Sequence, residues 1–312
     1  MILTLTLNPA VDISYKLDYL ALDVVNRVAD VSKTAGGKGL NVARVLHQLG
    51  EEVAASGFLG GSLGSFISAE LKAIGIEDLF VPIEGETRNC IAILHEGKQT
   101  EILESGPIIS KTEAELFLTN FEEHLSRVDL VTISGSLPKG LSSDFYAKLI
   151  EISNPYGTKV LLDANGALLT STLNSASKPY LIKPNEEEMA ELIGKSTIDE
   201  IEIIEALESI LFSAIPWVVV TLGENGAIIK HNQTIYRASL PRVDAINPVG
   251  SGDSVVAGFA AGIARGLTDE ELINFGLTMG VLNAQEEKTG YINVEEIETV
   301  SSQIQVERVN IH

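Results

Sequence analysis

The chain has 312 residues, of which 45% are hydrophobic and 21% are charged. This composition allows a large buried core and excludes a disordered protein. The net charge of −21 repels nucleic acids and anionic membranes, so we expect neither as a partner. A single cysteine, Cys90, excludes an intrachain disulfide and fits a reducing, cytoplasmic location. The first residues lack the features of a secretory signal, and no apolar run is long enough to span a bilayer.

Short apolar strand patterns alternate with longer helical patterns along most of the chain. Runs of Val, Ile and Leu between amphipathic helices indicate a parallel sheet that helices cover on both faces. In such a domain, ligands bind beyond the carboxyl ends of the strands. We predict strands at 2–7, 52–60, 128–135, 159–165, 180–185 and 217–223, and helices at 39–50, 64–75, 145–153 and directly after Asp253.

Two segments break this alternation, at residues 10–35 and about 86–106. Both show the alternating polarity of two-faced strands, and HEGK (95–98) has the composition of a hairpin turn. We therefore predict a small second sheet inserted in the α/β core. Such a sheet serves as a lid over the site or as a dimer surface.

The segment AGGKGLNVAR (35–44) places three glycines, a lysine and an asparagine at the start of a predicted helix. Glycines such as Gly37 let the backbone approach a ligand closely, Lys38 adds a positive charge, and Asn41 offers a donor and an acceptor. This combination suits a hydroxylated, phosphorylated ligand better than a plain turn. The pattern differs from the GxxxxGK[ST] loop of Walker-type phosphate sites.

The pentapeptide GGSLG (60–64) matches G-x-S-x-G, the nucleophile elbow of α/β-hydrolases, and lies between a strand and a helix. An acyl-transfer enzyme that uses Ser62 is therefore a second hypothesis. It needs a histidine in a loop after a late strand, and none of the candidates lies in a convincing one. A glycine loop on the substrate side is the preferred interpretation. The histidines that follow Ser62 are His95, His124, His231 and His312.

Two further segments place polar residues in or after strands. In ETRNC (86–90), Arg88 and its neighbour Asn89 fit a bound phosphate and a solvated strand about equally well. In TLGENGA (221–227), a nucleotide can lie along the turn, although a tight hairpin needs the same residues. The candidate nucleotide-binding residues in this turn are Thr221, Gly223 and Gly226.

The segment LIKPNEEEMAEL (181–192) joins a strand to a helix through Lys183, Pro184 and Asn185. Asn185 and Glu188 have the spacing of a helix-capping pair. The functional interpretation places both residues near a hydrated Mg²⁺, which keeps its waters and takes few protein ligands. Capping is favoured when the segment is considered alone.

The segment NPVGSGDS (247–254) is the strongest motif in the chain. Gly250, Ser251 and Gly252 can aim backbone N–H groups at one point and form an anion hole at a helix start. Asp253 beside this hole can take a proton from a hydroxyl group that attacks phosphorus. A simple helix-terminal charge, worth about 0.3–1 kcal/mol, explains the acid but not the glycines and serine next to it.

Together these motifs resemble those of the ribokinase-like (PfkB) carbohydrate kinases. The order NPAVD, GGKGLN, KPNEEE, TLGENGA and GSGDS is similar to that of the family over essentially the whole chain. The resemblance implies a ribokinase-like, doubly wound, mostly parallel α/β fold over residues 1–312 with a small β lid. It implies ATP as co-substrate, Mg²⁺ as cofactor and a homodimer through the lid, and it leaves activation by a monovalent cation open.

The resemblance also assigns roles to individual residues. Asp253 is similar to the catalytic base of the family, and Gly250, Ser251 and Gly252 are similar to its anion hole. GGSLG then becomes a glycine loop of the family, which removes the support for the hydrolase hypothesis. The implied sugar-phosphate ligands are Asp12, Arg27, Gly37, Lys38, Asn41, Arg88 and Asn89. The implied nucleotide and metal ligands are Lys183, Asn185, Thr221, Gly223, Gly226 and, through water to Mg²⁺, Glu188.

Within the family, NPAVD, KTAGGKGLNVARVL and ETRNCIAILHEGKQTEILESGP most resemble the tagatose-6-phosphate kinase branch, which belongs to lactose and galactose breakdown. This implies ATP-dependent phosphorylation of D-tagatose 6-phosphate at its C1 hydroxyl. The 1-phosphofructokinases share GGKGLN and the Thr-Arg pair, so fructose 1-phosphate is the alternative substrate. A regulator that binds a sugar phosphate without turnover is a third hypothesis, and the intact Asp253 argues against it.

Overall fold

The apolar strand patterns form the central layer of the structure, an 11-stranded sheet. The computed structural model describes residues 1–309. From β12 to β5 along this sheet, every two neighbouring strands are parallel. The strands β13, β14 and β15 are added antiparallel at one edge, so a mostly parallel sheet is confirmed. The strand order is β15 (Gln305–Arg308), β14 (Thr234–Ser239), β13 (Ala227–His231), β12 (Trp217–Thr221), β11 (Leu181–Ile182), β10 (Lys159–Asp163), β9 (Leu130–Ser134), β1 (Ile2–Thr6), β4 (Val53–Leu59) and β5 (Glu77–Asp78), with β6 (Val81–Pro82) also beside β4.

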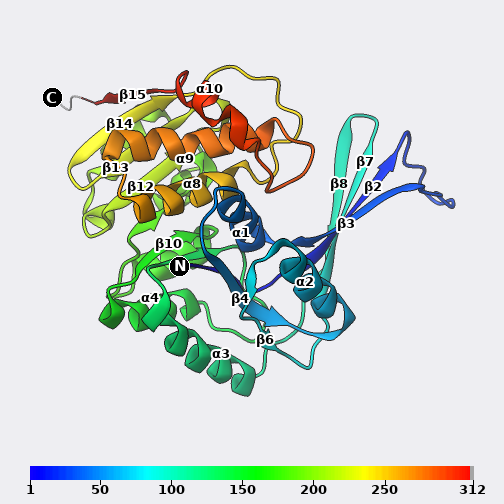
Figure 1. Ribbon diagram of the computed structural model, residues 1–312. Helices are drawn as coiled ribbons and strands as arrows, with labels where there is room; N and C mark the ends of the chain where they lie inside the picture. Colours follow the sequence, from blue (N-terminus) through cyan, green and yellow to red (C-terminus); the bar gives the residue numbers. More distant parts are fainter. Residues whose placement is uncertain (310–312) are drawn as a thin grey trace.

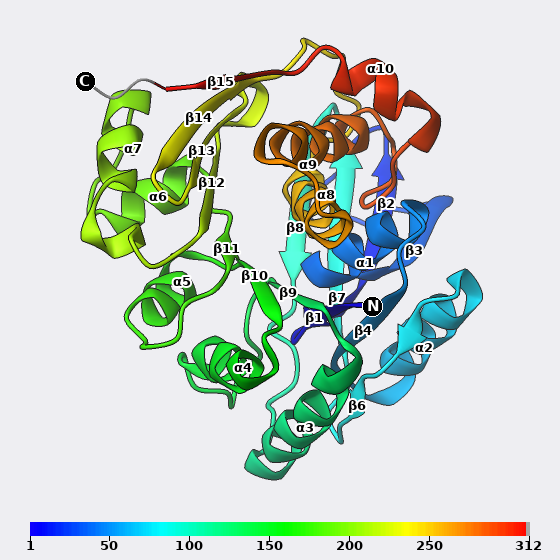
Figure 2. The same cartoon turned by 60° about the vertical axis from the view of Figure 1, so that its left-hand side comes forward.

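Central strands bury side chains on both faces of the sheet, because successive residues of a strand point to opposite sides. In β12, Trp217 and Val219 join the core on one face, and Val218 and Val220 join the core on the other. Helices cover both cores (Figure 2), so the doubly wound architecture is confirmed. One face carries α1 (Lys38–Gln48), α2 (Gly61–Ile74), α8 (Ser251–Arg265), α9 (Asp269–Ala284) and α10 (Ile297–Ser301); the other carries α3 (Lys111–His124), α4 (Phe145–Ser153), α5 (Gly166–Leu173), α6 (Glu186–Leu192) and α7 (Glu200–Leu207).

One predicted boundary is wrong at a position that matters for function. The sequence pattern places a helix after Asp253, but α8 begins at Ser251, so Asp253 lies inside its first turn. Gly250 is the N-cap, with a φ of 85° that favours glycine, and the helix therefore starts before its apolar run. The longest helix among residues 1–309 is α9 with 16 residues, and no described helix is long and apolar enough to cross a membrane.

A second, four-stranded sheet projects from the core (Figure 1) and is called the lid below. Its order is β3 (Asp30–Gly36), β2 (Ala10–Leu17), β7 (Arg88–His95) and β8 (Lys98–Leu103). The two hairpins are antiparallel, and the central pair of β2 with β7 is parallel. The predicted hairpin turn is present, since Glu96 and Gly97 both have positive φ, at 51° and 69°.

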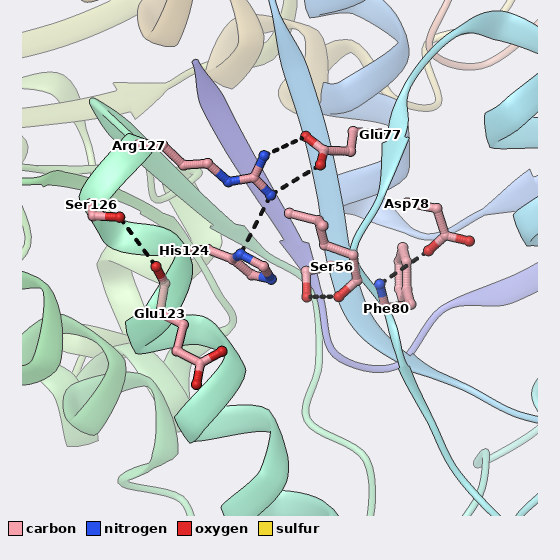
Figure 3. Close-up of polar contacts among 9 residues, drawn as sticks. Ser56, Glu77, Asp78, Phe80, Glu123, His124, Ser126 and Arg127 are labelled. Carbon is pink, nitrogen blue, oxygen red and sulfur yellow. Dashed lines mark hydrogen bonds and ion pairs between the residues drawn. The ribbon is translucent and has the colours of Figure 1, made fainter.

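The edge of the core sheet at β5 is held by the end of α3 (Figure 3). Arg127 follows α3 in a short 3₁₀ turn and forks onto Glu77 of β5 with N–O distances of 3.2 and 3.0 Å. His124 Nδ1 lies 3.4 Å from Arg127 Nη2, and burial together with this guanidinium lowers the pKa of the imidazole. Both charges of the pair are partly exposed, so we expect it to contribute less than about 1 kcal/mol.

Gly57 lets the strands β1 and β4 pair closely near the carboxyl end of β1. It lies opposite Thr6, and a Cβ at Gly57 would lie 2.0 Å from the Thr6 carbonyl oxygen. We expect Gly57→Ala to lower the free energy of unfolding by roughly 3 kcal/mol or more, because backbone must move. Gly50→Ala is the matched control, since Gly50 also has positive φ (80°) but no atom within 4 Å of the new Cβ. It should cost about 1–2 kcal/mol in urea unfolding; equal losses would contradict the prediction.

Candidate active site

A cavity of about 1650 Å³ lies between the carboxyl ends of the core strands and the lid. Residues at or just beyond the ends of β1, β9, β10 and β12 line it, α1 and α8 begin at it, and all four lid strands contribute to the opposite wall. Three buried hydroxyl groups at this cavity, those of Thr6, Ser134 and Ser251, have no hydrogen-bond partner within residues 1–309. Buried polar groups are usually paired, so these hydroxyls indicate a site for a polar ligand.

Most of the predicted site residues line this one cavity, although they are far apart in the sequence. They come from the lid, from the starts of α1 and α8, and from the ends of β11 and β12. The residues brought together are Asp12, Gly37, Lys38, Asn41, Arg88, Lys183, Asn185, Thr221, Gly223, Gly226, Gly250, Ser251, Gly252 and Asp253.

Three predicted residues do not line the cavity. Arg27 is exposed in the loop between β2 and β3. Asn89 faces away on β7, because its amide donates to Glu104 Oε1 at 3.2 Å. Glu188 forms a reciprocal capping box with Asn185, with N–O distances of 2.8 and 2.9 Å, so the capping interpretation is correct for the structure.

The start of α8 differs in one respect from the predicted anion hole. The N–H of Ser251 donates to the Pro248 carbonyl at 3.2 Å, so it belongs to the turn that opens the helix. The N–H groups of Gly252 and Asp253 lie in the first helical turn, where no intrahelical acceptor is available. A Cβ at Gly252 would lie 3.3 Å from Lys183 Nζ. Glycine therefore lets a lysine approach the positive end of the helix dipole.

An acid that the sequence analysis missed holds two of the predicted lysines. Asp163, at the end of β10, is 1% exposed and lies 3.3 Å from Lys38 Nζ and 3.2 Å from Lys183 Nζ. Burial raises the pKa of this carboxyl, but Lys183 and Lys38 outweigh burial and keep it below its ordinary value. Asp163 in turn raises the pKa of Lys38. The available signal was an acid directly after the apolar run VLL, at the carboxyl end of a parallel strand.

Asp253 is buried, at 5% exposure, and accepts a hydrogen bond from Asn41 Nδ2 at Oδ2, at 2.7 Å. Burial and the neighbouring Asp163 raise its pKa to about 6, while Lys38, the bond from Asn41 and Lys183 lower it. The carboxyl is therefore mostly ionised at neutral pH but more basic than an exposed aspartate. These are the properties of a general base.

The lid side of the cavity contains a second perturbed acid, Asp12 of β2. Burial raises the pKa of Asp12 to about 6, although Arg44 and Arg88 lower it. Arg88 is engaged with the backbone at the base of the lid: Nε and Nη2 donate to the Asn8 carbonyl at 3.2 and 3.1 Å, and Nη1 donates to the Glu104 carbonyl at 2.9 Å. The guanidinium thus ties both hairpins of the lid to the core.

The opposite end of the cavity combines the ends of β11 and β12 with an apolar wall. A parallel bridge joins Asn185 to Thr221, which places the predicted nucleotide residues side by side. The wall includes Val249 before α8 and Leu277 and Val281 of α9, an environment that suits a flat aromatic base. Three cations that the sequence analysis did not select also line the cavity, namely Lys16, Arg242 and Lys288.

The hydrolase hypothesis finds no support in the geometry. Ser62 Oγ donates to Glu86 Oε1 at 3.0 Å, and this carboxylate also accepts from the Leu63 N–H at the start of α2. His124 lies beside Arg127 at the β5 edge, His231 pairs with Asp269, and His95 bonds Thr100 at the lid tip. His312, the remaining candidate, lies outside the described residues.

Comparisons with known proteins agree with this arrangement. Residues 5–296 match the model of the pfkB family of carbohydrate kinases. A candidate phosphofructokinase from Staphylococcus aureus is 33% identical over 99% of both chains, with a TM-score of 0.86. A candidate 1-phosphofructokinase from Thermotoga maritima is 28% identical over 99% of both chains (TM-score 0.90), and phosphofructokinase-2 from Escherichia coli, crystallised with potassium, is 25% identical over 96% of this chain and 98% of its own (TM-score 0.89). The chain therefore belongs to the pfkB family of carbohydrate kinases.

Proposed function

We propose that residues 1–312 act as a single kinase domain that transfers the γ-phosphoryl group of ATP to the C1 hydroxyl of D-tagatose 6-phosphate. The products are D-tagatose 1,6-bisphosphate and ADP. The observation that carries this proposal is a buried Asp253, with a pKa of about 6, at a helix N-terminus beside two lysines. A base, an anion site and fixed cations within one cavity are the groups that phosphoryl transfer requires.

In the proposed step, Asp253 accepts the proton as the C1 oxygen attacks the γ-phosphorus. The O–H bond breaks, the new O–P bond forms, and the oxygen that bridged the β- and γ-phosphates leaves with ADP. Lys183, Lys38 and the first N–H groups of α8 stabilise the charge on the transferring group. Asn41 holds Asp253 through the 2.7 Å bond, so the base enters the reaction already oriented.

We propose that Glu188 binds a nucleotide-bound Mg²⁺ through the water molecules of the ion. Mg²⁺ keeps several waters and needs one or two carboxylates besides the phosphates, so a single acid that does not line the cavity but acts through water fits. The capping box uses only Oε2 of Glu188, and Glu188 is close enough to raise the pKa of Lys38. The ion would neutralise charge on the β- and γ-phosphates.

On the sugar side, we propose that Asp12, Gly37 and Asn41 bind the hydroxyl groups. We assign the 6-phosphate to Lys38 and Arg88, joined by Arg27. Tagatose 6-phosphate and fructose 6-phosphate differ at one carbon, so a few hydrogen bonds decide between them. The choice of tagatose depends on the resemblance of the N-terminal, glycine-loop and lid segments described above.

The second candidate is a 1-phosphofructokinase that phosphorylates fructose 1-phosphate. It is favoured by the assignments of the Staphylococcus aureus and Thermotoga maritima relatives, which carry the names phosphofructokinase and 1-phosphofructokinase. Both reactions use the same base and the same nucleotide site. They differ in which end of the ketohexose lies at Asp253 and in the configuration of the sugar at one carbon.

The pH dependence of kcat tests the role of Asp253. Because the base must be ionised and its pKa is about 6, we expect kcat to fall about tenfold per pH unit below pH 6 and to be level above it. Asp253→Asn should lower kcat by about 10²–10⁴-fold at all pH values, because the amide cannot accept the proton. The measurement is ADP release with saturating ATP, Mg²⁺ and sugar phosphate.

Asp12→Asn is the control for this profile, since burial also raises the pKa of Asp12 to about 6. We expect this variant to raise the KM for the sugar phosphate and to retain the fall in kcat below pH 6. A flat profile in Asp12→Asn would assign the titration to Asp12 and contradict the role of Asp253.

Substrate identity is tested by offering tagatose 6-phosphate, fructose 6-phosphate and fructose 1-phosphate to the purified protein in potassium and in sodium buffers. We expect the highest kcat/KM with tagatose 6-phosphate, about tenfold or more above fructose 6-phosphate. A preference for fructose 1-phosphate would select the second candidate. Binding without turnover of any of the three would select the regulator hypothesis.

We also propose that the lid mediates a homodimer. The loop between β2 and β3 exposes Tyr19, Leu22, Val24 and Val25, with 63% to 83% of each residue accessible. A contiguous apolar loop of this kind is typical of an interface. Arg27 lies in the same loop, so we propose that it acts across the contact, at the cavity of the other subunit.

Leu22→Asp combined with Val25→Asp should convert the dimer to a monomer and raise the KM for the sugar phosphate. Size-exclusion chromatography with light scattering measures the mass. Ile210→Asp is the control, because Ile210 is 90% exposed and lies in a short 3₁₀ helix far from the lid in the chain. A monomeric wild type, or a dimer that survives the double substitution, would contradict this proposal.

A further inference from the structure

Arg44 is a buried cation that neither the sequence motifs nor the proposed chemistry uses. It lies in α1, one helical turn after Asn41, and is 8% exposed. No carboxylate within residues 1–309 lies within 4 Å of its guanidinium. Burying a charge without an ion pair is costly, so its remaining contacts must explain its position.

The guanidinium donates to neutral oxygens beside the catalytic base. Nη2 donates to Asn41 Oδ1 at 2.5 Å, and Nη1 donates to the Ala35 carbonyl at 2.5 Å. The Thr289 carbonyl lies 3.5 Å from Nη2, and the Tyr291 ring faces the guanidinium at 5.9 Å. Arg44 therefore contacts the end of lid strand β3, the side chain of Asn41 and the segment after α9.

These contacts fix which way the Asn41 amide points. A side-chain amide can place either its oxygen or its NH₂ group toward a neighbour, and the two orientations have almost the same shape. Arginine has donors and no acceptor, so it stabilises only the orientation in which Oδ1 faces Arg44. In that orientation Nδ2 faces Asp253 Oδ2 and donates to it at 2.7 Å. The reverse orientation would place the amide oxygen against a carboxylate.

We propose that Arg44 is a positioning residue that acts through Asn41 to orient the base Asp253. This inference rests on the proposed kinase function and extends it by one residue. The groups that face Asp253 are Asp163 at the end of β10, Lys38 and Asn41 on α1, and Lys183 after β11, with Arg44 behind Asn41. Among residues 1–309, only Asn41 has side-chain hydrogen bonds to both Arg44 and the base.

Gln48 provides a matched control on the same helix. It lies one turn after Arg44 and holds the same segment after α9, through the Gly290 carbonyl at 3.0 Å and the Ile292 N–H at 3.0 Å. Its remaining bond is to the Arg44 carbonyl, so it contacts the backbone of α1 and not the Asn41 side chain. Gln48→Leu therefore removes hydrogen bonds that hold this segment without releasing the Asn41 amide.

The test compares Arg44→Met, Arg44→Lys, Asn41→Ala and the double variant Asn41→Ala/Arg44→Met. We expect Arg44→Met to lower kcat about 10- to 100-fold with little change in the KM for ATP, because the base is misoriented. The fall in kcat at low pH should move above pH 6, since the hydrogen bond that favours ionised Asp253 is lost.

Arg44→Lys keeps a donor-only group and should recover part of kcat. The double variant should be no slower than Asn41→Ala, because Arg44 acts only through Asn41.

Gln48→Leu should lower the melting temperature and leave the acidic side of the profile at its wild-type pH. Additive losses in the double variant, or the same pH profile in Arg44→Met and wild type, would show that Arg44 has only a structural role. Melting curves of every variant confirm that folded protein is compared.

A readout that needs no turnover separates this inference from the proposed function. In protein with ¹⁵N-labelled asparagine, the side-chain resonances of Asn41, assigned with Asn41→Ala, should shift as Asp253 titrates. The shift should disappear in Arg44→Met and persist in Gln48→Leu. If the wild type phosphorylates no sugar phosphate but these NMR results hold, the proposed function fails and the positioning role stands. If activity is as proposed but the Asn41 shift persists in Arg44→Met, the positioning role fails.

Discussion

The ion cluster of Asp163 with Lys38 and Lys183 is the interaction on which the site depends. The protein carries a net charge of −21, yet both proposed substrates are anions. The two lysines offset the negative charges of Asp163 and Asp253 at the strand ends, where a negative surface would otherwise repel phosphate. The three residues come from α1, β10 and the segment after β11, so the local charge exists only in the folded chain. Asp163 also pairs with Lys183, whose Nζ lies beside Gly252 at the start of α8.

The lid imposes a second constraint, because its strands return to the core at the site itself. β2 begins four residues after β1 ends, and β3 ends at Gly36, immediately before α1. Arg88 binds the carbonyls of Asn8 and Glu104 at two of the places where the lid meets the core. The lid strand that carries Asp12 and the glycine loop that carries Lys38 are therefore both joined directly to the base of the lid.

The sequence was sufficient for the parts of the fold that depend on local patterns. The period of the apolar residues predicted the parallel strands, and GSGDS with GGKGLN predicted that two helices begin near the cavity, although α8 begins earlier than predicted. Asp163 was missed because its role comes from lysines 125 and 20 positions away, and Arg44 because helical arginines are normally solvated. Asn89 was wrongly assigned to the cavity because it lies next to Arg88. Successive residues of a strand point to opposite sides, so Arg88 faces the cavity and Asn89 faces away from it. Pattern analysis identifies residue types near a site, while the partner of each side chain is decided by tertiary contacts.

The properties of Asp253 show how these contacts combine at one atom. Burial and Asp163 make its carboxyl more basic, while the two lysines and the Asn41 amide make it easier to ionise. The lysines and the Asn41 bond offset part of the effect of burial, and burial keeps the carboxyl more basic than an exposed aspartate. Asp163 acts in both directions, because it repels Asp253 directly and also holds the lysines that attract it. Burial is thus the largest influence on the pKa of Asp253, and Asp163 adds to it directly while it also holds the lysines that oppose it.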